Sequence, residues 1–523
     1  MPRPLILSLL CPALAAQAPA PAPAPLPPPA ALPGVTELSL ADAYRLALEN
    51  NLQARISRDE RDISRFGVQS EEGAFDWTLF AAAGTGRTQL EDANPKSSGL
   101  GNIFFSDAFS DQRTRFASLG MGKLFGWGGT ATLSVSPFWS STSVQQQNHP
   151  LDSNQITASQ FGTVNPYGGK LTLALNQPLL RGFGTDAAEA RLKAAQKRAE
   201  EGDISYQLSL IRLVATTDNL YWDHVFAVQN LANKRDALAL AQKQLDEDSE
   251  RVKSGMLAPL DLPQVEATVA EREKQVYSAE AEVENTRAAL LAQIYADQPR
   301  PGELRLADQP GPVPFDRSLD EAERLALENR PEVKVASTQV AERLIQERAA
   351  HNRLLPQLDA TLAYTGAAKS QDNLGPALTD LLQGQLPGYY VGLALAVPVG
   401  NRAARGAYGQ ARASRHEAEL VVSSVRQAIL LEVQQAYAAL KASEKQVEAA
   451  QKALDFRQKS LEAEQDKLEN GLSTSFFILQ RQDELDQART ALIQAQVDYR
   501  KALTGLQRAM GVLLERRLGP SKA

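Results

Sequence analysis

The stretch LADAYRLALEN at residues 40–50 decides the fold, because LDEAERLALEN at residues 319–329 repeats it. After each copy come segments with the alternation of β-strands and then two very long helical segments. A second echo joins LALNQP at residues 173–178 to LALAVP at residues 393–398. A period of this length is far too long for a solenoid of small units. The 523 residues are therefore expected to form two structural repeats of roughly domain size.

The N-terminal sequence predicts export from the cytoplasm. Residues 1–16 combine an early arginine, a short apolar run and small residues, as a cleavable secretory signal does. The only cysteine, Cys11, falls inside this segment, so the mature chain is expected to have neither disulfides nor thiol chemistry. Leu10 stands where a lipid-anchoring signal normally has a small residue, which disfavours lipidation. The net charge of −7 and the lack of a Lys/Arg-rich block argue against nucleic acid as a partner.

The predicted domain boundaries follow the duplication. Each repeat is expected to hold a leading helix, strands and a long helical hairpin. The predicted segments are, in order, the signal peptide (1–16), a Pro/Ala-rich lead-in (17–36), the first repeat (37–300), a Pro-rich linker (301–317), the second repeat (318–514) and a C-terminal tail (515–523).

Heptad patterns predict two antiparallel helical hairpins. Residues 186–253 contain no proline and a single glycine, so they can form one helix about 100 Å long at about 1.5 Å per residue. Apolar residues recur every seven positions in this helix and in its returning partner. Alanines beside the second returning seam favour packing against a further neighbour over an isolated hairpin. The second-half seam comprises Val433, Leu440, Val447, Leu454, Leu461 and Leu468, then Ile478, Leu485, Leu492, Tyr499, Leu506 and Leu513.

Between the helices the periodicity of apolar residues falls to two, which predicts strands. One face of each segment is apolar and the other is polar or small, as Leu171 and Leu173 show against Thr172. No apolar run after the signal reaches the roughly 18–20 residues of a membrane-spanning helix, so any spanning structure is expected to consist of strands. Aromatic residues near the strand ends favour an outer-membrane barrel over a soluble sandwich. Because a barrel in lipid must close, several copies are expected to pool their strands.

These features resemble the TolC-like outer-membrane efflux proteins, the outer membrane factors of tripartite efflux and type I secretion systems. The similarity covers the duplicated helices, QPLLRG at residues 177–182, LPQL at residues 355–358 and two glycine turns in the hairpins. It implies a mainly α fold with a membrane β-barrel. In such a homotrimer the helices form a trimeric α-helical tunnel in the periplasm, and each subunit gives four strands to a shared outer-membrane β-barrel.

The resemblance also implies a function, partners and a location. We expect a passive exit duct that docks to a periplasmic adaptor, or membrane fusion protein, and to an inner-membrane transporter of RND or ABC type. We expect the cell outer membrane as the location, with outer-membrane lipid around the strands. Drugs, metals and secreted polypeptides are all open as cargo. The alternative is a periplasmic coiled-coil adaptor or scaffold without a channel, although such a protein would not need duplicated lipid-patterned strands.

The turns of the two hairpins are the predicted adaptor-docking tips. Gly255 and Met256 lie at the first turn, and Gly471 and Leu472 lie at the second. A glycine after a helix is the usual left-handed cap. Any helical hairpin needs such a turn, so the docking role comes from the resemblance alone.

The resemblance also places a periplasmic gate or constriction just beyond the tips. Asp261 matches a family position that helps to latch the closed tunnel. Where well-known members carry an arginine and two aspartates, this chain has Ser473, Phe477 and Gln480. We therefore expect Phe477 to make a hydrophobic constriction in place of an acidic, cation-sensitive gate.

The first half carries extra length between Trp77 and Gln177, with room for four strands where the second half has room for two. Residues 116–125 and 130–138 flank a Gly-Trp-Gly-Gly turn that predicts a hairpin. We expect this hairpin to extend a surface-exposed or equatorial region. The alternative is a barrel with more strands than the family norm.

No feature of the sequence predicts an enzyme, a cofactor or a metal site. The segment GMGK at residues 120–123 lacks the earlier glycine and the following Ser/Thr of a phosphate-binding loop. The four histidines are scattered without cysteine partners or an HExxH pattern, and His224 occupies a heptad position that predicts packing. No nucleophile elbow or carboxylate pair is present.

Overall fold

The described chain divides into two compact units, each built from three segments. Unit 1 takes its segments from residues 1–51, 217–311 and 453–497, and unit 2 takes residues 52–216, 312–452 and 498–523. Both repeats contribute to both units, so the units do not coincide with the repeats. The computed structural model describes residues 35–97, 103–150, 157–164, 167–255, 262–297, 301, 303–311, 313–370, 373–383, 386–470 and 472–518.

The duplicated stretch forms two equivalent helices, α1 (Leu40–Asn50) and α6 (Leu319–Asn329). Each helix follows a serine in an extended backbone conformation, Ser39 or Ser318. In both cases the serine Oγ accepts a hydrogen bond of 3.2 Å from the backbone amide three residues later. Such a cap satisfies an amide that the first turn of a helix leaves unpaired. The prediction of a duplicated leading helix is confirmed.

In unit 1 the linker between the repeats is tied to the start of α1. Strand β1 (Val35–Leu38) pairs in parallel with β7 (Glu303–Leu306). Just after β7, the carboxylate of Asp308 accepts hydrogen bonds of 2.8 Å from the Leu40 amide and from the Tyr221 hydroxyl. A carboxylate is stabilising at this place because the N-terminus of a helix carries partial positive charge.

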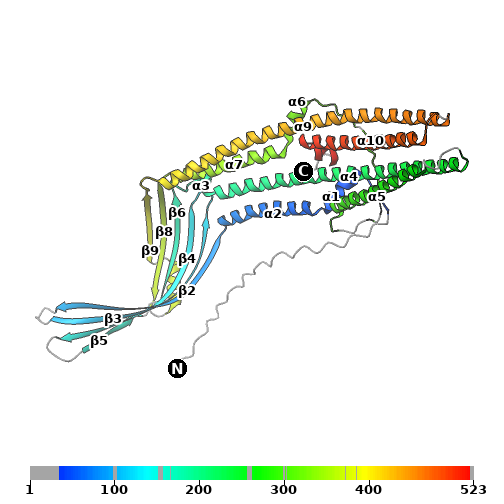
Figure 1. The fold of residues 1–523 in the computed structure, drawn as a ribbon. Helices are drawn as coiled ribbons and strands as arrows, with labels where there is room; N and C mark the ends of the chain where they lie inside the picture. Colours follow the sequence, from blue (N-terminus) through cyan, green and yellow to red (C-terminus); the bar gives the residue numbers. More distant parts are fainter. Residues whose placement is uncertain are drawn as a thin grey trace, which may run out of the picture. The chain divides into compact units, whose positions relative to one another are not determined.

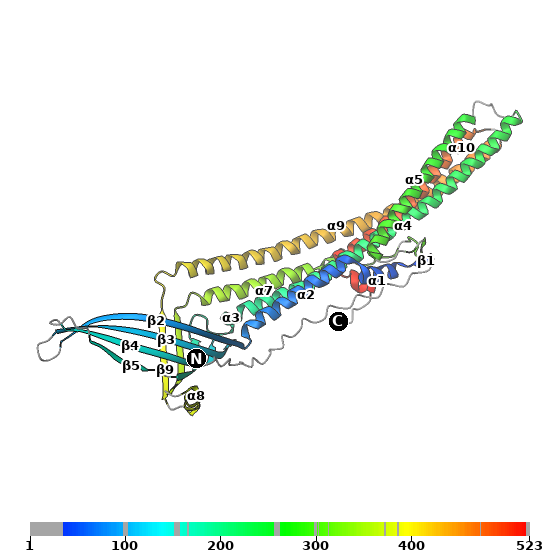
Figure 2. The same ribbon diagram turned by 90° about the horizontal axis from the view of Figure 1, so that it is seen from below.

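The two predicted hairpins are present as long helix pairs (Figures 1 and 2). The first pair is α4 (Ala190–Lys253) with α5 (Leu262–Tyr295), and the second is α9 (Arg402–Glu469) with α10 (Ser475–Ala509). The remaining helices are α2 (Leu52–Glu72), the 3-10 turn η1 (Gly73–Phe75), α3 (Thr185–Ala188), α7 (Pro331–Asn352), α8 (Leu374–Gln383) and α11 (Leu513–Leu518). No described helix combines the length and the apolar character that crossing a bilayer requires.

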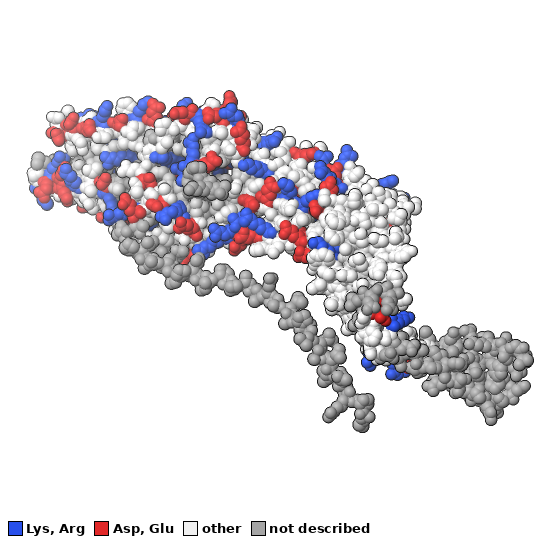
Figure 3. All heavy atoms as spheres, turned by 180° about the vertical axis from the view of Figure 1, so that it is seen from behind, with Lys and Arg blue, Asp and Glu red and all other residues white. Residues whose placement is uncertain are grey.

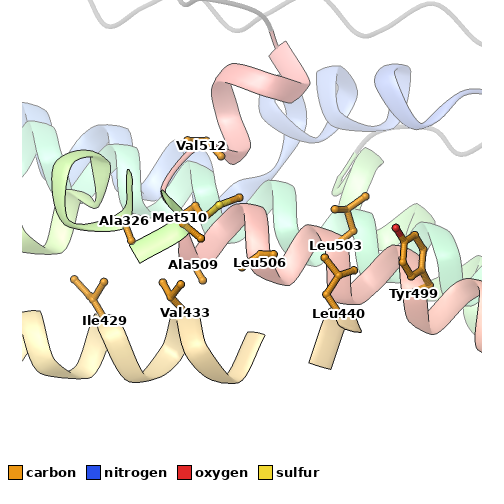
Figure 4. Close-up of a cluster of buried hydrophobic side chains, with 11 residues drawn as sticks. Ala326, Ile429, Val433, Leu440, Tyr499, Leu503, Leu506, Ala509, Met510 and Val512 are labelled. Atoms are coloured by element: carbon orange, nitrogen blue, oxygen red, sulfur yellow. The ribbon is translucent and has the colours of Figure 1, made fainter. Parts of the chain in front are cut away.

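The heptad seam of α9 and α10 forms a core in each unit. In unit 1, Leu461, Ile478 and Leu485 are buried together. In unit 2, Val433, Leu440, Tyr499 and Leu506 are buried with residues of α6, and Figure 4 shows them meeting between the helices. Hydrophobic burial of this kind, and not helix propensity, supplies most of a helix's stability in a protein. The predicted seam is confirmed at these positions.

All other described strands form one sheet in unit 2. Its order is β2-β3-β4-β6-β8-β9, with β5 paired to the far part of β4, and every pairing is antiparallel. On the face drawn in Figure 3 the described sheet surface carries few charges, whereas the helices are densely charged. The strands are β2 (Thr78–Ser97), β3 (Ile103–Leu124), β4 (Thr130–Pro150), β5 (Thr157–Val164), β6 (Tyr167–Pro178), β8 (Gln357–Ser370) and β9 (Leu386–Ala396).

The structure corrects the expectation for the extra hairpin. The predicted hairpin is formed by β3 and β4, which pair from Leu124 and Thr130 at the turn up to Phe104 and Pro150, and it is not a separate extension because β4 also pairs with β6. Its glycine-rich turn lets the two strands reverse directly, with Gly128 at a φ of +92°, a conformation that favours glycine. In this copy β2, β3, β4, β6, β8 and β9 lie side by side in one sheet.

Candidate functional site

The predicted tips lie where the long helices of unit 1 end. Gly255 follows the end of α4 with a φ of +77°, the left-handed conformation expected of a glycine cap. Leu472, after the end of α9, is highly exposed, with 78% of its surface accessible. Met256, Asp261 and Gly471 lie outside the described residues.

Two aromatic rings are exposed at the start of α10. Phe477 packs edge-on against Phe476, with 5.3 Å between ring centroids. Their exposed fractions are 44% and 49%, which is unusual for adjacent phenylalanines, and Gln480 is exposed one turn later. Ser473 donates a hydrogen bond to Glu464 at the end of α9. The first turn of α10 thus presents an apolar pair to its surroundings.

A buried carboxylate holds the first residue of α10 against α4. Asp248 of α4 is fully buried, and its Oδ1 accepts hydrogen bonds from Ser475 Oγ at 2.8 Å and from Gln244 Nε2 at 3.0 Å. Among the described residues, no hydrogen bond reaches Asp248 Oδ2. The carboxylate also lies beside the N-terminus of α10, where a negative charge is favourable. These contacts fix the position from which the exposed phenylalanines project.

A second buried network lies farther along α10 and joins it to both helices of the first hairpin. Asp486 of α10 is 4% exposed, and its Oδ2 lies 3.1 Å from Arg272 Nη1 of α5 and 2.5 Å from Lys234 Nζ of α4. Asn233 Nδ2 donates to Asp486 Oδ1 at 2.8 Å, and Arg272 Nη2 lies 2.8 Å from Asp483 Oδ1. Two positive and two negative side chains therefore balance one another across three helices. Losing one member would leave an uncompensated charge in a buried place.

Neither network was predicted from the sequence. A signal for the second one was present, because Arg272 interrupts the apolar seam between Val269 and Val276, at a spacing of three and four residues. A polar residue inside such a seam costs stability and often specifies register or partner. The signal for Asp248 is weaker, since acidic residues surround it in the sequence.

A histidine is buried in the first hairpin. His224 of α4 is 1% exposed, and its Nδ1 lies 3.0 Å from Thr286 Oγ1 of α5. Burial, aided by the positive charge of Arg287, lowers the pKa of His224 to about 4. The prediction that this histidine packs within a helix pair is confirmed. Within the described residues, no group of three or more His, Cys, Asp or Glu side chains is arranged to hold a metal ion.

Solved structures with the same fold are outer-membrane channels. The Campylobacter jejuni CmeC outer membrane channel superposes with a TM-score of 0.63 at 15% identity, covering 91% of this chain and 86% of that one. The open-state MtrE outer membrane channel of Neisseria gonorrhoeae gives a TM-score of 0.60 at 17% identity, covering 91% and 90%. The class is therefore an outer-membrane channel fold, with a helical tunnel and strands for a barrel.

Two sequence comparisons match this chain to outer membrane efflux proteins. Residues 323–512 match the family described as "Outer membrane efflux protein". The outer membrane efflux protein BepC of Brucella suis biovar 1 (strain 1330) is 26% identical over 359 residues, which are 67% of this chain and 74% of that protein. Both matches are to outer membrane efflux proteins, the family that the sequence resembles. These matches support the prediction of an exit duct in the outer membrane with helices in the periplasm, since the proteins matched are channels and not enzymes.

Proposed function

We propose that three copies of this chain form an exit duct that opens at the hairpin tips when an adaptor and an inner-membrane transporter engage it. The duct is passive, because its interior needs only to conduct what the transporter delivers. The adaptor contacts the tips at Gly255, Met256, Gly471 and Leu472. An exposed glycine turn and an exposed leucine suit a helical hairpin as the partner, since both allow close approach.

Two buried hydrogen-bond and ion-pair networks on α10 support the gating part of this proposal. Both Asp248 and Asp486 tie the second hairpin to the first, so the hairpins hold one relative position until the contacts are broken. A change of position between packed helices is an ordinary way to switch a protein between two states. Docking of an adaptor at the tips would then need to offset these contacts.

The exposed phenylalanines are the proposed constriction. Rings from several copies, brought together at a common axis, would form an apolar ring that excludes water and ions. Phe477 is the predicted residue, and Phe476 lies against it. Asp261 helps to latch the closed tunnel through a partner other than the arginine of well-known members. This arrangement is compatible with an inner-membrane transporter of either the ABC or the RND type, because the constriction residues do not distinguish between the two types.

Single-channel recording in planar bilayers tests the constriction. Purified protein is expected to conduct ions, and Phe477→Asp is expected to raise conductance and to create block by divalent cations. Phe477→Leu keeps an apolar side chain at this position and is expected to leave both properties close to those of the unaltered protein. If Phe477→Asp left conductance and cation block unchanged, the constriction would lie elsewhere. A protein that formed no pores at all would refute the duct itself.

A further inference from the structure

One row of paired residues crosses the whole sheet, including the extra hairpin. The row consists of Leu79, Met121, Leu133, Leu173, Tyr364 and Tyr389. Side chains two positions apart on a strand share a face. On β2 this face adds Ala81 and Ala83, and on β9 it adds Val391 and Leu393. The apolar face thus runs without interruption from β2 to β9, and the hairpin is in register with it.

Aromatic and basic side chains border this apolar face on β3. The Lys123 ammonium lies 5.4 Å from the centre of the Trp77 ring, and the Arg115 guanidinium lies 5.1 Å from that of Trp139. The stretch of β3 from Lys123 to Arg115 is about 27 Å long at roughly 3.4 Å per residue. Outer-membrane barrels carry an apolar band about 25 Å tall between two aromatic girdles. The hairpin therefore carries its own share of a membrane band.

The opposite face is built in the same way in the hairpin and in the rest of the sheet. Aromatic rings lie directly over glycines on the neighbouring strand. A Cβ at Gly84 or Gly120 would come within 2.7 Å of the Phe116 ring or 2.3 Å of the Phe80 ring. Between β4 and β6, Gly168 lies under Phe138 in the same manner, at 2.3 Å. Such pairs fill the space above strand glycines and help to fix register.

The hairpin turn is anchored to the end of the sheet. Phe125 N donates to Gly129 O at 2.8 Å within the turn, and Gly184 N donates to Trp127 O at 3.1 Å from the segment after β6. A Cβ at Gly128 would meet the carbonyl oxygen of Gly182 at 2.2 Å, so the backbones touch there. The hairpin is therefore fixed to the rest of the sheet where β4 pairs with β6 and at its turn.

The sheet ends in two exposed edges. Among the described strands, β2 pairs only with β3, and β9 pairs only with β8. Leu79 near the start of β2 is 65% exposed and Leu393 on β9 is 71% exposed. In lipid each unpaired backbone group costs several kcal/mol, so neither edge can stay open. The strands β2 and β9 run in opposite directions, because five successive antiparallel pairings separate them.

We infer that each copy supplies six strands to the shared barrel, so that three copies make eighteen, and that β2 of one copy pairs antiparallel with β9 of the next. This inference rests on the proposed function, which supplies the further copies. The chain thereby departs from the four strands per subunit that its family resemblance implies. Since diameter grows roughly in proportion to strand number, the barrel is about half as wide again.

The register of this pairing follows from the geometry of the sheet. If the start of β2 at Thr78 lies level with the end of β9 at Ala396, Leu79 faces Leu395 and Ala81 faces Leu393. Leu395 lies six residues beyond Tyr389, the residue in the same row as Leu79. The offset of six residues along the strand is about 20 Å, and the width of the six strands of one copy is about 29 Å. The ratio of the offset to the width corresponds to a strand tilt of about 35° from the barrel axis. Membrane barrels have tilts of about 35–45°.

Cysteine crosslinking of the full-length protein in outer membranes tests the pairing. In a Cys11→Ser background, the double variant Ala81→Cys with Leu393→Cys is expected to form covalent dimers and trimers on oxidation, which reductant reverses. The matched control is Ala82→Cys with Leu393→Cys, whose side chains lie on opposite faces and are expected to give no product. A barrel of four strands per copy would place β4 of one copy beside β9 of the next, with Leu133 level with Leu393. The double variant Leu133→Cys with Leu393→Cys therefore tests for this four-strand arrangement.

The outcomes separate this inference from the proposed function. Products from the Ala81 pair, absent from the Ala82 and Leu133 pairs, support eighteen strands. Products from the Leu133 pair alone overturn the inference and leave the trimeric duct intact. Failure of the Ala81 pair together with a monomer by light scattering in detergent overturns both. Failure of the Ala81 pair in a protein that is still trimeric overturns the inference alone.

Discussion

The Asp486 network gives the sharpest test of how the second hairpin is held. In Asp486→Asn the side chain keeps its size but loses its charge, so Lys234 loses its counterion and Arg272 keeps only the exposed Asp483. Removing one partner of a buried ion pair costs about 3–5 kcal/mol, because the other charge stays buried and unpaired. Asparagine retains one acceptor, so we expect the lower end, about 3 kcal/mol. A change of about 1.4 kcal/mol alters an equilibrium constant tenfold. The ratio of copies whose second hairpin is released from the first to copies in which it is held therefore rises roughly 100-fold.

The assay is single-channel recording, with the ratio of open to closed time as the readout. The matched control is Arg235→Gln, since Arg235 is the neighbour of Lys234 and pairs with Glu280 of α5 at 2.7 Å, but with both side chains exposed. Exposed pairs contribute about 0.2–1 kcal/mol, so the control is expected to shift the ratio by about fivefold at most. An Asp486→Asn ratio no larger than that of the control would refute the assignment of this network as a latch.

A rescue variant separates unpaired charge from lost packing. Replacing a buried ionic set by apolar residues of similar volume is often neutral or stabilising. The triple variant Lys234→Met, Arg272→Met and Asp486→Leu is therefore expected to return the open-to-closed ratio toward that of the unaltered protein. If the triple variant opened as readily as Asp486→Asn, the effect of the single change would come from altered packing and not from charge.

Three further predictions concern stability, each measured by unfolding in detergent. His224 is neutral in the folded protein, because its pKa is lowered from 6.5 to about 4, so below pH 6.5 the unfolded chain binds one more proton than the folded chain. The free energy of unfolding is therefore expected to fall by about 3 kcal/mol as the pH drops from 6.5 to 4. The variant His224→Gln is expected to remove this pH dependence. Leu440→Ala is expected to lower the free energy of unfolding by about 2–5 kcal/mol, because it opens a cavity in the core of unit 2. Its control, Lys445→Ala on the exposed side of the same helix, is expected to change stability by less than about 0.5 kcal/mol. Equal effects of the two substitutions would contradict the assigned core. Ser318→Ala is expected to cost about 1 kcal/mol through loss of the α6 cap, and restoration by Ser318→Asn would confirm the cause.

Periodicity and duplication were sufficient to predict the helices. The seam through Leu440 and Leu485 consists of apolar residues in consecutive heptads, and the two serine-capped helices have similar sequences. Both signals are local or repeated, so no knowledge of distant contacts is needed to read them. The strand faces followed from alternation in the same way. The short parallel pair β1–β7 was missed, because four residues are too few for a periodic signal.

Distant contacts were the part that the sequence could not supply. Arg272 and Asp486 are far apart in the chain, and nothing local says that their side chains meet. The place of the extra hairpin is a similar case. Its alternation predicted strands, but the expectation of a separate extension was wrong, because β4 pairs with β6, with Leu133 in register with Leu173, and that pairing joins distant segments. The predicted roles of Met256, Asp261 and Gly471 stay predictions.

The most direct test of the account is electron microscopy of the detergent-extracted protein at a resolution that separates strands. We predict hollow particles with three-fold symmetry, each subunit giving two helical hairpins to a tunnel and six strands to a common barrel. Solid rods, or a protein that stays soluble without detergent, would contradict the exit duct and would favour a periplasmic scaffold instead.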